Sequence, residues 1–147
     1  MRAFLILPLI ALLLTATPMR AQQQQQVQPN LDAVTFPDYD SFTAFLDEKV
    51  MQRQFGVLMQ KMSGGSLSLA QVQQLTEQMR QGFTTDFDHV AVMRQAELED
   101  GFRQELRVYW AGNIYAYVVM LVHQRENDIA VLNLGIHVAP VQALAMF

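Results

Sequence analysis

The part of the chain from residue 89 onward constrains the fold most, because apolar and polar side chains alternate there with a period of two. Three turn signals interrupt the alternation: Glu99-Asp100-Gly101, Gly112-Asn113 and Asn127-Asp128. They divide this part of the chain into predicted strands at residues 89–98, 102–111, 114–126 and 129–139. Short turns join antiparallel neighbours, so we expect an antiparallel meander sheet.

The lengths of the turns determine which side chains share a face of this sheet. With two-residue turns at the second and third signals, and with Gly101 left-handed in a three-residue first turn, one face is almost entirely apolar. Only Arg94, Gln104 and His123 interrupt it. Its apolar members are Val90, Val92, Ala96, Leu98, Phe102, Leu106, Val108, Trp110, Tyr115, Tyr117, Val119, Leu121, Ala130, Leu132, Leu134, Ile136 and Val138. We expect helices to cover this face.

The opposite face divides into two halves. Its first two strands carry Glu97, Arg103, Glu105 and Arg107, which we interpret as a solvated surface with Arg103 opposite Glu97. Its last two strands carry an apolar patch, which is typical of an interface and predicts a homodimer. The interface residues are Ile114, Val118, Met120, Val122, Ile129 and Val131. Alternatively, residues 31–37 or the tail at 140–147, which is expected to form a helical turn, fold across the patch.

Two amphipathic helices precede the strands and provide the cover. The first is expected from Asp40 or Ser41 to the glycines after Ser63, and the second from Ser68 to about Gly82. Ser68 and Gln71 have the spacing of a capping box. The predicted fold class is therefore α+β, with two N-terminal helices packed on one face of a four-stranded antiparallel meander sheet and a short C-terminal tail.

The N-terminus is predicted to be a secretory signal peptide over residues 1–21. Arg2 precedes an apolar run at residues 3–14, and small residues follow, with cleavage after Ala21 or alternatively after Ala16. The run is shorter than the roughly 20 residues of a membrane span, so we expect no stable span after cleavage; the alternative is an uncleaved anchor. The glutamine-rich residues 22–37 are predicted to be a flexible spacer before a single domain at residues 38–147.

Composition excludes several classes of function. The chain has 10 basic and 14 acidic residues, and two of the basic ones, Arg2 and Arg20, lie in the signal peptide. An acidic domain without a basic stripe is a poor nucleic-acid binder. The absence of cysteine excludes a disulfide framework and a lipid anchor on cysteine. We therefore expect a periplasmic or secreted domain held by its core alone.

The order of helices followed by antiparallel strands resembles the nuclear transport factor 2-like, or cystatin-like, α+β superfamily, especially its small exported members. The segments MRQAEL, GFRQELRVYW, YAYVVMLVHQ and IAVLNL between residues 92 and 134 carry this resemblance. It implies a sheet curled around a conical pocket, which some members use for catalysis and others for binding.

The sequence contains no recognisable catalytic constellation. The three histidines, His89, His123 and His137, lack metal-binding spacing, and His123 and His137 are expected on opposite faces; no metal site and no cofactor is predicted. Asp88 and His89 would point to opposite faces of a strand and so form no dyad. Nucleophile motifs and phosphate-binding loops are absent.

A binding pocket is the remaining hypothesis for a site. Its predicted ligand-binding residues are Arg94, Gln104, Trp110, Tyr115, Tyr117 and His123. Methionines of the helices would give an adaptable lining, namely Met51, Met59, Met62 and Met79. Alternatively, the aromatic side chains are simply cross-strand pairs and the methionines simply core.

The favoured function is a non-enzymatic exported module that binds a protein partner or a small apolar ligand. One alternative is a pocket enzyme of the isomerase or hydrolase kind that uses His123 with Arg94. A second alternative is an accessory subunit or inhibitor of an exported enzyme.

Overall fold

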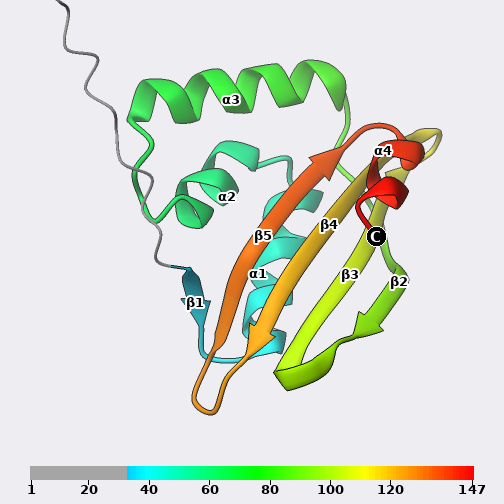
Figure 1. Cartoon of the computed structure of the whole chain (residues 1–147). Coiled ribbons are helices and arrows are strands. Elements are labelled where there is room, and N and C mark those ends of the chain that lie inside the picture. The colour runs from blue at the N-terminus through cyan, green and yellow to red at the C-terminus, as the bar shows by residue number, and fades with distance from the viewer. Residues whose placement is uncertain (1–32) are drawn as a thin grey trace, which may run out of the picture.

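The computed structural model describes residues 33–147, in which a five-stranded antiparallel sheet is flanked by helices (Figure 1). The elements in chain order are β1 (Val34–Phe36), α1 (Tyr39–Met51), α2 (Phe55–Met62), α3 (Leu69–Gly82), β2 (His89–Glu97), the 3-10 turn η1 (Glu99–Gly101), β3 (Phe102–Ala111), β4 (Ile114–Gln124), β5 (Ile129–His137) and α4 (Pro140–Ala145). The predicted signal peptide and most of the predicted spacer lie outside the described residues.

The α+β class and the antiparallel meander are confirmed. The four predicted strands are β2 to β5, neighbours in the sheet order β1-β5-β4-β3-β2, and the predicted C-terminal helical turn is α4. The tight turn at Gly112 brings Ala111 opposite Ile114, as expected. A fifth strand was not predicted: β1 lies within the predicted spacer and pairs with β5. Three residues are too few for a period of two to be recognised.

The two faces of the sheet are exchanged relative to the prediction. The five predicted interface residues Val118, Met120, Val122, Ile129 and Val131 are buried in the core, and Ile114 packs at its margin. The face expected beneath the helices is the outer face, on which α4 lies, in front of the strands in Figure 1, whereas α1 lies behind them. Both faces are apolar enough to be covered, so alternation alone does not decide which one receives the helices.

Two β-bulges also move side chains between the faces. In β2, Val92 lies opposite Arg107 and Arg94 opposite Leu106, which leaves Met93 as the extra residue. In β5, Leu132 is the extra residue. A bulge of one residue reverses the alternation beyond it. Consequently Val90, Leu134 and Ile136 pack against the core beneath the helices. Val92 lies on the same face of the sheet by register but is exposed.

The predicted first helix is two helices. It breaks after Met51, and Arg53 adopts a left-handed conformation at φ 54°. The Arg53 side chain holds the break in place, because its Nε donates to Asp86 at 2.6 Å and its guanidinium donates to the carbonyl oxygen of Phe83 at 2.9 Å. The chain thereby turns α2 away from α1, so that Phe42 and Leu46 of α1 and Phe55 and Leu58 of α2 all enter the core.

The third helix, α3, lies at the periphery of the domain. Its capping box is confirmed, with Ser68 and Gln71 each accepting a hydrogen bond from the other's backbone. It packs mainly on α2, and Val72 is its only buried residue. In Figure 1, α2 and α3 continue the helical layer past β5.

Replacing Ser68 with Ala is expected to lower the free energy of unfolding by about 1 kcal/mol, because the first turn of α3 loses its cap. Urea denaturation followed by circular dichroism measures this change. Ser66→Ala, two residues earlier and outside the cap, is the control. Equal midpoints for the two variants would contradict a stabilising role of the cap.

Candidate functional site

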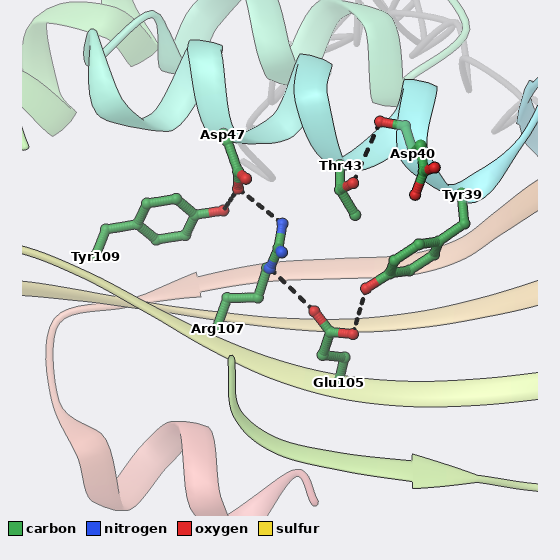
Figure 2. A network of polar contacts seen from close by, with 7 residues as sticks. All are labelled: Tyr39, Asp40, Thr43, Asp47, Glu105, Arg107 and Tyr109. Carbon is green, nitrogen blue, oxygen red and sulfur yellow. Dashed lines mark hydrogen bonds and ion pairs between the residues drawn. The ribbon is translucent and has the colours of Figure 1, made fainter. Parts of the chain in front are cut away.

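A buried network of polar side chains joins α1 to β3 (Figure 2). Tyr39 and Asp47 are eight residues apart on α1, with Thr43 midway between them, so the three form one stripe along the helix. Glu105, Arg107 and Tyr109 alternate along β3 and therefore share the face beneath α1. Two regular periodicities thus bring the two rows of polar groups together. The residues of the network are Tyr39, Asp47, Glu105, Arg107 and Tyr109.

The contacts run continuously from one end of the network to the other. The Tyr39 hydroxyl donates to Glu105, and Glu105 Oε1 forms an ion pair with Arg107 Nε at 3.0 Å. The guanidinium of Arg107 then donates to Asp47 Oδ1 at 2.7 Å, and the Tyr109 hydroxyl donates to the same oxygen at 2.6 Å. The ion pair lacks hydrogen-bond alignment, so Glu105 Oε1 and Arg107 Nε remain buried without a hydrogen bond. The attraction of Arg107 is therefore the main compensation for burying this oxygen of Glu105.

Burial and charge determine the protonation states. Burial, followed by the hydrogen bond to Glu105, raises the pKa of Tyr39 to about 12. Burial and the neighbouring Asp47 raise the pKa of Tyr109 well above its ordinary value. Burial alone would lower the pKa of Arg107, but Tyr109, Asp47 and Glu105 outweigh it and raise that pKa. Both phenols are therefore neutral hydrogen-bond donors near pH 7, and Arg107 stays charged.

Sequence reasoning missed this network. Glu105 and Arg107 were interpreted as part of a solvated surface, whereas Glu105 is fully buried. The available signal was register: Glu105 lies opposite Met120 and Arg107 opposite Val118, so charged groups share a face with a strongly apolar row. The predicted pair of Arg103 and Glu97 is confirmed at 2.6 Å and is partly exposed.

The network is a clamp between α1 and β3, because each of its five side chains contacts another member of the network. One end reaches a cleft of about 260 Å³ lined by Tyr39, Glu97 and Arg103, with the Arg103 guanidinium 4.5 Å from the centre of the Tyr39 ring. With Tyr39 protonated near neutral pH, this cleft offers hydrogen-bond donors and a cation but no general base from the network.

The raised pKa of Tyr39 predicts a pH dependence of stability. In the unfolded chain the phenol loses its proton near pH 10.0, whereas the folded protein retains it to about pH 12. The contribution of Tyr39 is therefore fully present below pH 10 and is lost as pH rises to about 12. In urea denaturation at stepped pH, the wild-type protein is expected to lose stability more steeply in this window than Tyr39→Phe. Parallel curves for the two proteins would contradict the assignment.

The predicted ligand-binding residues lie on the outer face and are not brought into one pocket. At one end, His123 stacks on Phe102 with ring centres 4.1 Å apart. At the other end, Tyr115 and Tyr117 lie with ring centres 6.4 Å apart, and Trp110 stacks on His89 at 4.9 Å.

The C-terminal residues occupy the middle of the outer face. Ala143 of α4 is fully buried against Leu106 and Val119. The Gln104 side chain donates to the backbone oxygen of Met146 at 2.6 Å, and the Arg94 guanidinium lies 4.7 Å from the centre of the Phe147 ring. Arg94 and Gln104 are therefore engaged with the tail of the chain.

The histidines do not form a metal site in the structure. His123 and His137 share the outer face, because the β5 bulge reverses the predicted orientation of His137. However, His123 pairs with Ala130 and His137 with Tyr117, which is six pairs further along the β4–β5 ladder. Asp88 and His89 approach to 3.4 Å at the exposed surface. Between residues 33 and 147, no three histidine or acidic side chains are grouped closely enough to hold a metal ion.

An apolar groove, which we call the methionine groove, lies between β5 and the two helices α2 and α3. One section of about 400 Å³ and a second of about 220 Å³ share Met59, Leu75 and Leu134. The helices contribute Phe55, Met59, Met62, Ser63, Leu67, Leu75 and Met79, and the strand contributes residues 131–136. Three of the four methionines predicted as an adaptable lining are thus in this groove, whereas Met51 packs against the core.

No helix in the described part of the chain is long and apolar enough to cross a membrane. Comparison with models of protein families, with curated proteins and with solved structures found no match.

Proposed function

We propose that this chain is a non-enzymatic binding module and that the methionine groove is its binding site for uncharged apolar groups. The groove carries the proposal because it is an apolar hollow between α3 and the edge of the sheet. Among the described residues, no charged side chain lines it. Methionine side chains are flexible and polarizable, so they adapt to ligands of different shapes. A small apolar ligand and an apolar segment of a partner protein both fit this chemistry.

The alternative of a pocket enzyme has less support from the geometry. Its proposed pair, His123 and Arg94, is separated along β3, since His123 lies opposite Phe102 and Arg94 opposite Leu106. Arg94 is also engaged with Phe147, and His123 Nε2 lies 3.0 Å from the backbone oxygen of Asp100. Neither side chain reaches the methionine groove.

We further propose that the protein is exported and that its fold is of the nuclear transport factor 2-like type. A helical layer against an antiparallel meander is consistent with that resemblance, and an apolar groove is consistent with a module that acts on other exported proteins as an accessory subunit or inhibitor. The proposal does not include the predicted homodimer through Ile114, Val118 and their neighbours, because α1 and α2 cover that surface.

Binding of the uncharged dye Nile red, followed by its fluorescence, tests the proposal. Met79→Glu places a charge in the groove and is expected to weaken binding at least about tenfold, because the carboxylate would be desolvated without a partner. Leu69→Glu is the matched control, since Leu69 is on the same helix and 71% exposed. Dye binding that survives Met79→Glu but is lost in Tyr115→Glu would move the site to the outer face and overturn the proposal.

A further inference from the structure

The edge of β5 that faces β1 is paired along only part of its length. Val34 lies opposite Val131 and Phe36 opposite Ile129, so β1 covers three residues of β5. Among the described strands none pairs with this edge beyond Val131, although β5 continues to His137. At about 3.3 Å per residue, residues 132–137 form roughly 20 Å of edge that is open with respect to residues 33–147. An open edge presents backbone donors and acceptors ready to pair with another strand.

The methionine groove runs beside this open edge. Its strand wall is formed by residues 131–136, and its other wall is formed by α2 and α3, which lie next to β5 in Figure 1. An occupant of the groove would therefore contact two features at once: the backbone of β5 and the side chains of Met59, Leu75 and Met79. A compact ligand could use only the second feature, whereas an extended peptide can use both.

The chemistry of the lining restricts the peptide. Within the part of the chain that the structure describes, the polar side chains that line the groove are those of Ser63 and Asn133, and neither is charged. A charged side chain would lose its hydration in this groove without gaining a partner. The matching segment is therefore uncharged where it enters the groove.

The pairing of β1 shows how such a segment would lie, because the open edge is the direct continuation of the β1–β5 ladder. β1 runs antiparallel to β5. Its first and third residues, Val34 and Phe36, pack against the core, whereas Thr35 between them is exposed. Beyond Val131, Leu134 and Ile136 face the helical layer in the same alternating manner. A strand added in line with β1 would place every second side chain in the groove.

We propose that the methionine groove binds an extended, uncharged peptide segment of a partner protein, which adds to the free edge of β5 as an antiparallel strand in line with β1. This inference rests on the proposed binding function and identifies its ligand class. Backbone hydrogen bonds to β5 give the affinity, and alternate apolar side chains against Met59, Leu75 and Met79 give the specificity.

The test uses the mature chain and a fluorescent, capped hexapeptide of alternating threonine and apolar residues, Ac-Thr-Val-Thr-Phe-Thr-Val-NH2, followed by fluorescence polarization. The peptide is expected to bind, and N-methylation of alternate amides is expected to weaken binding at least about tenfold, since it removes the edge hydrogen bonds. Leu132→Asp is expected to weaken binding by a similar factor, because Leu132 lines the groove. Val138→Asp is the matched control, because Val138 follows β5 directly, does not line the groove and is also exposed.

Each contrary outcome separates this inference from the proposed function. Nile red binding without peptide binding would leave the binding function standing and overturn strand addition. Equal affinity for the methylated and unmethylated peptides would also overturn it, since the backbone would then play no part. Hydrogen-exchange protection of the outward amides of residues 132–137 before peptide is added would show that the chain itself or a second copy covers the edge, and would overturn a partner peptide. Failure of both the dye and the peptide would overturn both proposals.

Discussion

Replacing Arg107 with Leu is expected to lower the free energy of unfolding by about 3–5 kcal/mol, because it leaves the carboxylate of Glu105 buried without its cation. Glu105 has no solvent exposure, and its Oε1 makes no hydrogen bond that would replace the ion pair with Arg107 Nε. Asp47, which is partly exposed, can regain water when the guanidinium is removed. The loss therefore originates mainly at Glu105. Urea denaturation at pH 7 measures it.

Arg103→Leu is the matched control for this prediction. It removes an arginine from the same strand and the same face, but its partner Glu97 is largely exposed. The expected cost of that change is at most about 1 kcal/mol. The double variant Glu105→Met with Arg107→Leu is expected to recover most of the stability, since no buried charge remains. A single Arg107→Leu variant as stable as Arg103→Leu would contradict the clamp between α1 and β3.

The strands and the pairing of β3 with β4 were predictable because turn chemistry and alternation act locally. The predicted two-residue turn at Asn127-Asp128 was wrong, because β4 ends at Gln124 and Gln124 lies opposite Ile129, so four residues connect β4 to β5. The register of β3 with β4 follows from the two-residue turn at Gly112, and it places Phe102 opposite His123 and Trp110 opposite Tyr115. The bulges at Met93 and Leu132 were not predictable, since each depends on contacts between strands and not on a turn signal. One inserted residue was enough to reverse the orientation of His137.

The choice of the covered face depended on information that the alternation does not contain. An apolar outer face with Leu106 and Val119 can be covered by a short helix such as α4, and an inner face with Glu105 and Arg107 can be covered if a helix brings matching polar groups. Tyr39 and Asp47 are those groups, and their role becomes visible only when α1 is placed against β3. The methionine groove likewise depends on the position of α3 relative to β5, and the amphipathic pattern of α3 does not specify that position.

Gly56→Ala is expected to detach α3 from α2 and to weaken binding in the methionine groove strongly. A Cβ atom at Gly56 would lie 2.1 Å from Thr76 Oγ1, 2.5 Å from the backbone oxygen of Val72 and 2.8 Å from Val72 Cγ1. Overpacking of this kind costs about 1–3 kcal/mol. Because Val72 is the only buried residue of α3, moving the helix away costs less than straining the core.

Hydrogen exchange and dye binding together measure this effect. The amides of α3 are expected to lose protection in Gly56→Ala, while those of α1 and β4 keep theirs, and Nile red binding is expected to fall at least about tenfold as one wall of the groove leaves. Gly82→Ala is the control, since a Cβ there meets nothing within 4 Å. Adding Thr76→Ala is not expected to rescue Gly56→Ala, because the contact with the Val72 backbone oxygen remains. Retained protection of α3 together with lost dye binding would place the binding determinant elsewhere than in the spacing of α2 and α3.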